Sequence, residues 1–289
     1  MGDAKRATGR RSWTIRVMGP RDVPDGLRLC RAAGWNQLEE DWRAMLDHGL
    51  FRVAVREGRV LGSAGALVYG RLAWVAMVLV EPQERRQGIG TGLVEDVVSL
   101  LGRVEVVGLD ATPAGAAVYG RLGFADCGGL VRMERPAGAV TRAAAAPGLR
   151  HPVEADLETV GRWDRGVFGA DRTLLLRWAC RQAPEYAWVR VGARGLGGYV
   201  FGRHGHRTEH LGPLVAEDED TAEALLAAVL AQSPARPFTI DAPERGSWIA
   251  RLRGLGFEVQ RPFRRMILGD GACPGDAAAT FAVFGPELG

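Results

Sequence analysis

Two arginines and two glycines form the stretch of this chain with the clearest chemistry. Arg85, Arg86, Gly88 and Gly90 follow an apolar, β-branched run and open a segment with apolar residues at helical spacing. The first backbone N–H groups of a helix have no intrahelical partner, and the helix dipole adds positive potential there. Glycines let the main chain approach a ligand closely, and the guanidinium groups add charge. This stretch therefore predicts a site for a phosphate-bearing ligand.

The loop differs from the two commonest nucleotide-binding motifs. No Lys-Ser or Lys-Thr pair follows its glycines, as a P-loop requires, and residues 88–90 lack the third glycine of the dinucleotide fingerprint. Arg85, Gly88 and Gly90, placed shortly after a strand that ends before Pro82, instead resemble the pyrophosphate loop of the GNAT superfamily of N-acetyltransferases. The resemblance implies acetyl-CoA as the ligand, with its pantetheine arm along the preceding strand. The cofactor-binding residues that it implies are Val78, Leu79, Val80, Arg85, Arg86, Gln87, Gly88, Ile89, Gly90 and Thr91.

A second segment lies downstream at the distance expected for the same family. Residues 119–124 read Tyr-Gly-Arg-Leu-Gly-Phe and are similar to the family's Tyr-x-x-Leu-Gly-Phe segment. The resemblance gives Tyr119 the role of the acid that protonates the departing CoA thiolate, and a phenol proton suits this role. The alternative is that Tyr119 only packs as a half-buried aromatic residue. Many relatives carry an asparagine for the pantetheine before this segment, and here Asp110 or Thr112 stands in its place.

The second half of the chain repeats the first. Between Leu79 and Leu122, and again between Leu214 and Leu255, the pattern predicts a strand, a helix, a second strand and a second helix that ends in Leu-Gly-Phe. Such repetition predicts two copies of one fold. The predicted elements are a strand over 104–109, a helix over 116–122 and a strand over 130–134, and in the repeat a helix over 221–230, a strand over 238–241 and a helix over 248–255.

From about residue 12 to residue 289 the chain resembles a two-domain subgroup of the GNAT superfamily, through segments at 34–37, 168–172, 211–215, 261–266 and 284–289. The implied fold class is α/β (α+β): two tandem GNAT folds, each with a mixed, mostly antiparallel central sheet flanked by helices. An Ala-rich stretch without apolar periodicity predicts a linker. We expect an N-terminal domain over 12–137, a linker over 138–147 and a C-terminal domain over 148–289.

The second copy lacks the phosphate loop. Where the first copy has residues 85–90, the second has the acidic run at 217–220. Acidic residues suit the start of a helix that holds no ligand, and they would repel a pyrophosphate. We therefore expect one cofactor site per chain, in the N-terminal domain. The second domain then shapes the acceptor pocket or stabilises the first.

Residues that would meet the acceptor have a weaker signal. The resemblance places Trp35, Asn36 and Glu39 on a helical segment that lines the acceptor cleft. Glu39, Glu40 and Asp41 are the candidates for a general base. The alternatives are that they form a solvated helix face and that a chain of water molecules takes the proton.

One carboxylate and three histidines of the second copy allow alternative interpretations. Asp241 ends a strand at the position that matches Asp110, and it either faces the inter-domain cleft, as an acceptor residue, or caps the following helix. His204, His206 and His210 lie in a predicted hairpin, where the first two share a strand face. No cysteine or carboxylate completes a recognisable set, so we interpret them as surface residues and expect no metal site.

Composition excludes several classes of protein. The 289 residues include 37 basic and 34 acidic ones. Nucleic-acid binding would need a basic face interleaved with aromatic residues, and the sequence has no such pattern, so we expect no nucleic-acid partner. No apolar run approaches the ~20 residues of a membrane span, and no signal peptide is predicted. We expect neither zinc nor a disulfide framework, and we place the chain in a reducing cytoplasm. The cysteines behind this expectation are Cys30, Cys127, Cys180 and Cys273, which form no C-x-x-C pair.

These features predict an acetyl-CoA-dependent N-acetyltransferase that transfers an acetyl group to the amine of a small-molecule acceptor by direct attack in a ternary complex. Such an enzyme holds the amine near the thioester carbon and polarises the thioester oxygen. The resemblance places the donor to that oxygen on the backbone near Val78 or Leu79. The alternatives are a non-catalytic acyl-CoA-binding sensor and a protein N-acetyltransferase. A tandem already buries the face that single-domain relatives use to dimerise, so we expect a monomer, with a dimer as the alternative.

Overall fold

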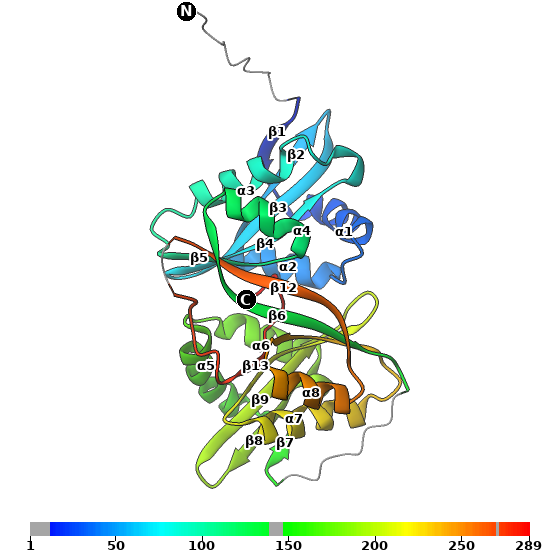
Figure 1. Cartoon of the computed structure of the whole chain (residues 1–289), viewed down its shortest axis with the longest axis vertical. Helices are drawn as coiled ribbons and strands as arrows, with labels where there is room; N and C mark the ends of the chain where they lie inside the picture. The colour runs from blue at the N-terminus through cyan, green and yellow to red at the C-terminus, as the bar shows by residue number, and fades with distance from the viewer. Residues whose placement is uncertain (1–11, 139–146, 270–271) are drawn as a thin grey trace, which may run out of the picture.

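The computed structural model describes residues 12–138, 147–269 and 272–289 (Figure 1). In the first half of the chain, an initial strand and a helical pair precede three consecutive strands, and helices and strands alternate after them. Its elements are β1 (Thr14–Val17), α1 (Val23–Ala32), α2 (Glu39–His48), β2 (Gly49–Arg56), β3 (Arg59–Tyr69), β4 (Leu72–Val80), α3 (Ile89–Ser99), β5 (Val106–Ala111), α4 (Pro113–Arg121) and β6 (Phe124–Arg135), with short 3-10 helices at η1 (Pro20–Asp22) and η2 (Pro82–Glu84).

The second half runs through the same kinds of element in the same order. The predicted linker lies almost wholly outside the described residues. The elements of the second half are β7 (Leu149–Arg150), α5 (Glu154–Phe168), α6 (Thr173–Gln182), η3 (Pro184–Tyr186), β8 (Trp188–Gly192), β9 (Gly195–Arg203), β10 (Glu209–Ala216), α7 (Glu219–Gln232), β11 (Phe238–Pro243), α8 (Gly246–Gly254), β12 (Glu258–Leu268) and β13 (Thr280–Ala282).

The six elements predicted around the two Leu-Gly-Phe segments are all present. Their type is confirmed, and the observed bounds are mostly wider than the predicted ones. The largest difference is in β6, which begins at Phe124 and not at residue 130. Polar residues and two glycines interrupt the apolar pattern between these positions. The strand continues there because β12 supplies a full ladder of partners along its length.

In the described ranges, one sheet of 13 strands contains all the strands of both copies. Its order is β1-β2-β3-β4-β5-β12-β6-β11-β10-β9-β8-β7, and β13 pairs with β10 beside this path. Neighbouring strands are antiparallel except for two pairs, β4 with β5 and β10 with β11. The predicted fold class is confirmed, since the sheet is mixed and mostly antiparallel, and helices flank it (Figure 1).

The two halves exchange their last long strands. β12, from the second half, pairs with β5 of the first half, and β6, from the first half, pairs with β11 of the second. Figure 1 shows β6 and β12 crossing side by side between the two halves. The main hydrophobic core also spans both halves, because Trp42 and Trp74 share it with Phe201 and Phe284. The domain ranges 12–137 and 148–289 stay a prediction, and each half needs a strand of the other.

Two ion pairs at equivalent positions link the exchanged strands to their hosts. The Arg265 guanidinium on β12 donates to both carboxylate oxygens of Asp110 on β5, at 2.9 and 2.8 Å. The Arg132 guanidinium on β6 donates likewise to both oxygens of Asp241 on β11, at 2.8 and 2.7 Å. Both carboxylates are fully buried. Burial raises the pKa of Asp110, and the positive charge of Arg265 offsets part of this rise.

Packing around β4 and α3 positions the predicted loop. Leu93, Val94 and Val97 of α3 are buried against the sheet, as their helical spacing predicts. The Trp74 ring covers Gly108 so closely that a Cβ on this glycine would lie 2.4 Å from the ring. Because Trp74 and Gly108 are the last paired residues of β4 and β5, this contact marks the point where the two strands diverge.

The expectation of no disulfide was wrong. Cys127 on β6 and Cys273, which follows β12, are disulfide-bonded, with their Cα atoms 5.5 Å apart. They are separated by 146 residues, and only the strand exchange brings them together, so cysteine spacing gave no signal. Cys30 and Cys180 are free thiols. No helix within 12–138, 147–269 or 272–289 is long and apolar enough to cross a membrane.

Candidate active site

The cleft with the predicted cofactor residues lies where β4 and β5 separate. The two strands pair only from Leu72 to Trp74 and from Val106 to Gly108, and beyond this point they open a cleft of about 660 Å³. A bulge leaves two residues of β4 opposite Ala64, and Met77 within it has a φ of 53°. The Ser63 hydroxyl donates to the Met77 carbonyl at 2.9 Å and holds this bulge. A bulge and a positive φ in a non-glycine residue are typical of functional strand ends.

The predicted pyrophosphate loop closes one end of the cleft. Gly88 caps the start of α3 with a φ of 77°, a conformation that favours glycine. A Cβ on Gly90 would have Val80 as its nearest neighbour, at 3.4 Å, so the main chain here is open on the cleft side. Arg85 is exposed and, like Gly90, lines the cleft. Arg56 anchors the loop through two bonds of 3.0 Å to the Glu84 carboxylate.

Tyr119 lines the same cleft from α4. The Thr112 hydroxyl begins this helix by accepting a bond from Gly115 N–H at 3.2 Å, and the Tyr119 ring packs edge-on against Phe124. Burial raises the pKa of Tyr119 to about 12, so the phenol stays protonated at neutral pH. No hydrogen-bond partner for its hydroxyl occurs in the described part of the chain. A protonated phenol on a cleft wall is able to donate to a ligand.

The predicted substitutes for the pantetheine asparagine have other partners. The Thr112 hydroxyl caps α4, and the Asp110 carboxylate is bonded by Arg265. Both residues still line the cleft.

The predicted acceptor residues separate into two groups. Trp35 lines the cleft, but Asn36 and Glu39 do not. Asn36 instead bonds the backbone of the loop at 206–208, with its amide nitrogen 2.7 Å from the Thr208 oxygen. Glu39 is exposed and pairs with Arg43 on its own helix. Asn36 and Glu39 are therefore not cleft residues. The side chain of Asn36 is hydrogen-bonded to the loop between β9 and β10, and the side chain of Glu39 faces solvent.

Asp241 and the histidines also differ from the predictions. Asp241 does not cap a helix, since α8 begins at Gly246 with Arg245 as its cap. It lies on β11 beneath the cleft and holds Arg132, which lines the cleft. His210 is buried beside Asp241, where burial and then the charge of Arg203 lower its pKa to about 4. The surface interpretation of His210 was wrong, because β10 is a central strand of the shared sheet.

His204 and His206 do not share a strand face, since both follow the end of β9. Nδ1 of His204 lies 2.7 Å from a carboxylate oxygen of Glu209. Across the described ranges, no three His, Cys, Asp or Glu side chains are grouped as metal ligands.

Several residues that line the cleft were missed. All but Gln37, which precedes α2, come from the exchanged strands and from the segment after β13, so their distance in sequence from the loop concealed them. Figure 1 places the last residue of the chain near the centre of the molecule, between the two halves. The segments at 261–266 and 284–289 were noted only as family-like. The missed residues are Gln37, Arg132, Arg261, Phe263, Pro286 and Glu287.

Glu287 brings a buried carboxylate to the cleft. Arg203 lies between two acids and donates to Asp41 at 2.6 Å and to Glu287 at 2.7 Å. Burial alone would raise the pKa of Glu287, but the charges of Arg203 and His210 and hydrogen bonds from Gln37 and Arg203 together outweigh it, so the pKa falls to about 2. Glu287 is therefore ionised at neutral pH. An ionised carboxylate here is suited to accept a hydrogen bond from an amine.

The equivalent split in the second copy is filled by the chain itself. β10 and β11 pair from Glu209 to Leu211 and then separate, as β4 and β5 do. β13 pairs with the free end of β10, and the Trp248 indole donates to the Phe281 carbonyl at 2.8 Å. Nothing comparable fills the first split among the described residues.

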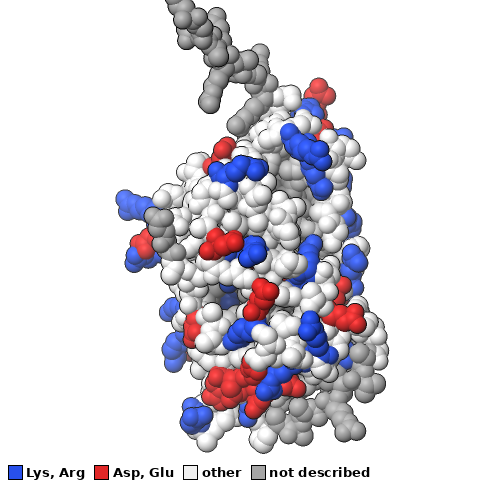
Figure 2. Space-filling view, viewed as in Figure 1, with Lys and Arg blue, Asp and Glu red and all other residues white. Residues whose placement is uncertain are grey.

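The helix that would face a ligand in the second split starts with acidic residues. Asp218 caps α7 by accepting from Thr221 N–H at 2.7 Å. On the face drawn in Figure 2, acidic side chains gather over the start of α7, while charges of both signs are interspersed elsewhere. The predicted cap is confirmed, and an acidic helix start disfavours phosphate.

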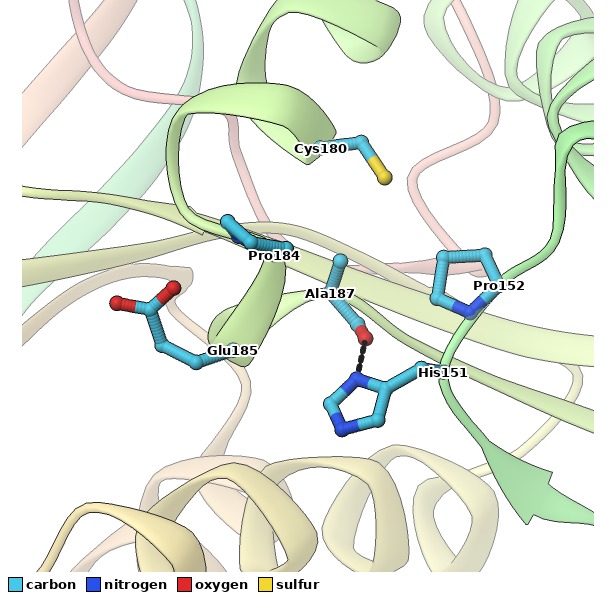
Figure 3. A pocket seen from close by; sticks show the side chains of 6 residues that line it. All are labelled: His151, Pro152, Cys180, Pro184, Glu185 and Ala187. Carbon is cyan, nitrogen blue, oxygen red and sulfur yellow. Dashed lines mark hydrogen bonds between the residues drawn. The ribbon is translucent and has the colours of Figure 1, made fainter.

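Another cavity, of about 240 Å³, lies in the second half and contains Cys180 and His151 (Figure 3). Nδ1 of His151 donates to the Ala187 carbonyl at 2.8 Å, and the ring is turned toward that oxygen and not toward the thiol. Burial raises the pKa of Cys180 and keeps the thiol protonated. The two side chains therefore do not form an activated nucleophile.

The fold and the site define an acetyltransferase of the GNAT type. The family described as "Acetyltransferase (GNAT) domain" matches the chain twice, over residues 47–126 and over residues 160–282. The chain belongs to the GNAT superfamily and carries two GNAT domains in tandem. The predicted recognition is thereby confirmed, and the family supports acyl transfer as the activity.

Known proteins of similar sequence or structure agree with this assignment. An uncharacterized N-acetyltransferase of Bacillus subtilis, YitH, is 26% identical over 234 residues, which are 80% of this chain and 83% of that protein. A putative acetyltransferase from Pyrococcus horikoshii has a TM-score of 0.81 at 20% identity, over 100% of both chains. A tandem GNAT protein from the clavulanic acid biosynthesis pathway has a TM-score of 0.62 at 17% identity, over 90% of this chain and 99% of that one. At these identities the two structures show a shared fold.

Proposed function

We propose that this chain is an acetyl-CoA-dependent N-acetyltransferase that acetylates the amine of a small-molecule acceptor in a ternary complex. The observation that carries the proposal is the open split between β4 and β5, which ends at the glycine start of α3 and has Tyr119 on its wall. The site fits the co-substrate, because the main chain at Gly90 is approachable and the exposed Arg85 adds positive charge for a pyrophosphate.

Different parts of the cleft bind different parts of acetyl-CoA. In the proposal the first turn of α3 and the loop before it bind the pyrophosphate, and the end of β4 binds the pantetheine arm. A backbone N–H near the bulge, at Val78 or Leu79, donates to the thioester oxygen, where negative charge develops. The residues assigned to the co-substrate are Val78, Leu79, Val80, Arg85, Arg86, Gln87, Gly88, Ile89, Gly90 and Thr91.

The transfer needs one bond to form and one to break. The amine nitrogen attacks the thioester carbon, the new C–N bond forms, and the C–S bond breaks. Tyr119 donates a proton to the departing sulfur and regains one from water. The proton lost by the amine passes to water, because Glu287, with a pKa of about 2, is too weak a base to hold it. Glu287 instead orients the amine by accepting its hydrogen bond.

A small acceptor is favoured over a protein. The second half supplies Arg261, Phe263 and Glu287 to the acceptor end of the cleft, so both halves bound the space there. We also propose that the two domains span 12–137 and 148–289 and that the chain acts as a monomer in the cytoplasm. The shared sheet supports the monomer, because strands that a dimer could exchange are exchanged within one chain.

Calorimetric titration with acetyl-CoA tests the co-substrate. We expect one site per chain, with binding abolished in the double variant Arg85→Glu, Gly88→Asp. Arg194→Glu is the matched control, because Arg194 is exposed and does not line the cleft. Two sites would mean that the second split opens in solution. Absence of binding would refute the proposal.

Turnover separates an enzyme from a sensor. Free CoA thiol released in the presence of a panel of small amines would measure acetyl transfer. Tyr119→Phe should lower turnover while leaving acetyl-CoA affinity unchanged. Binding without turnover of any amine or peptide would favour the sensor, and turnover of peptides alone would favour protein acetylation.

A further inference from the structure

Two arginines on neighbouring strands line the part of the cleft that the proposal assigns to the acceptor. Arg261 on β12 and Arg132 on β6 are direct partners in the antiparallel ladder, so their side chains project from the same face of the sheet. Both lie over the ring of Phe263, with their Cζ atoms 5.0 and 5.1 Å from its centroid. All three side chains line the cleft. The stacking fixes both cations in place.

The two arginines differ in their partners. Arg132 is matched by the Asp241 carboxylate, which accepts two of its hydrogen bonds. Arg261 has no hydrogen bond or ion pair within the described ranges, and its Nε is buried without a partner. Burial lowers the pKa of Arg261, and repulsion from Arg132 adds to this effect. Asp241 is thus the one carboxylate that is hydrogen-bonded to this pair of cations in the described ranges, while Glu134 and Glu287 act on them only through their charge. An unmatched, partly buried guanidinium is costly unless an anion meets it.

In the internal repeat, the strand equivalent to β12 forms without an arginine at the position of Arg261. Counted from the leucine of each Leu-Gly-Phe segment, Arg261 corresponds to Gly128, and Arg265 corresponds to Arg132. Both copies keep the paired arginine with its aspartate, so that pair serves the strand exchange. The unpaired arginine occurs once, and it occurs on the side of the open cleft and not beside the filled second split. Its equivalent, Gly128, carries no charge.

We propose that Arg261, with Arg132 beside it, binds a carboxylate of the acceptor, so that the acceptor is a small amine bearing a carboxylate, of the amino-acid class. The inference rests on the proposed function, since it assigns the acceptor of the same cleft. Arginine presents a planar fork of donors that matches a carboxylate. Glu287, ionised on the same cleft, provides the acceptor for the amine. Polyamines and aminoglycosides carry amines but no anion for Arg261.

The test compares each amino acid with its own carboxamide, which keeps the amine and removes the negative charge. Wild-type protein should prefer the acid in kcat/KM. In Arg261→Gln the ratio of acid to amide should fall ~10–100-fold, through the KM for the acid, as expected for the loss of a charge-assisted hydrogen bond. Arg264→Gln is the matched control, because Arg264 lies on the same strand, is exposed, and does not line the cleft. That control should keep the wild-type ratio.

A second measurement keeps the inference independent of turnover. The shift in melting temperature with free amino acids, and with their amides, reports binding whether or not transfer occurs. If acetyl-CoA binding or turnover fails but acids still stabilise the protein in an Arg261-dependent way, the proposed function falls and the carboxylate site stands. Equal use of acid and amide by wild-type protein, or an equal loss in Arg264→Gln, would overturn the inference. A stronger preference for phosphoethanolamine would overturn the carboxylate in favour of a phosphate.

Discussion

Replacing Arg265 by methionine tests whether the buried ion pairs hold the exchanged strands. Arg265 is 16% exposed in its side chain, its partner Asp110 is 0% exposed, and two hydrogen bonds join them. Removing one partner of such a pair leaves an uncompensated charge and costs about 3–5 kcal/mol. Methionine keeps much of the packing over Trp74, on whose ring the guanidinium now lies.

The loss should depend on pH, and its sign follows from Asp110. Burial raises the pKa of Asp110 in the wild type, and without Arg265 nothing offsets that rise. A folded-state pKa above the unfolded one means that the folded state binds more protons, so stability falls as pH rises between the two values. The variant should therefore lose about 3–5 kcal/mol at pH 8 and progressively less as the pH falls, because Asp110 loses its charge when it takes up a proton.

Urea denaturation at pH 5, 6.5 and 8 measures this difference. The control is Arg43→Met, which breaks an exposed helical pair with Glu39 and should cost less than about 0.5 kcal/mol at each pH. A loss in Arg265→Met below about 1 kcal/mol, or one that does not change with pH, would refute the reasoning that this pair is a buried and compensated charge.

Three further predictions follow from the site and the fold. Tyr119→Phe should lower kcat ~10²–10⁴-fold, the usual worth of a general acid, with acetyl-CoA affinity unchanged in calorimetry; an unchanged kcat would leave Tyr119 as a packing residue. The pKa of Glu287 is about 2 against an ordinary 4.5, so its contribution of about 3 kcal/mol is present above pH 4.5 and is lost as pH falls toward 2; Glu287→Gln should remove this acid dependence from the unfolding curve, and a curve with the wild-type slope would contradict the assignment. Reduction of the Cys127–Cys273 disulfide should lower the melting temperature by several degrees, since the bond closes a loop of 146 residues. Cys127→Ser should show the lowered melting temperature with and without reductant. A wild-type melting temperature that does not change when reductant is added would exclude a stabilising bond.

Much of the first copy was predictable because its signals are local. The apolar run, the arginines and the glycines of the loop lie within about twenty residues, and each follows from backbone geometry that neighbouring residues set. The same holds for the Tyr119 helix and for the Asp218 cap. The proposed acceptor residues were harder to predict from the sequence. Trp35 and Asn36 are adjacent in sequence, yet Trp35 lines the cleft and Asn36 binds a loop of the second half.

The sequence alone determined the fold family, the repeat and the single phosphate loop, since periodicity, glycine positions and charge at a helix start act over short distances along the chain. Tertiary structure alone decided that β6 and β12 change places. This exchange brings Arg132 and Arg261 to the cleft and forms the Cys127–Cys273 bond, and the segment after β13 adds Glu287. A strand's own pattern fixes which face it buries but not which distant strand it pairs with. That choice depends on the packing of both halves together, and in this chain it builds the part of the cleft that we propose for the acceptor.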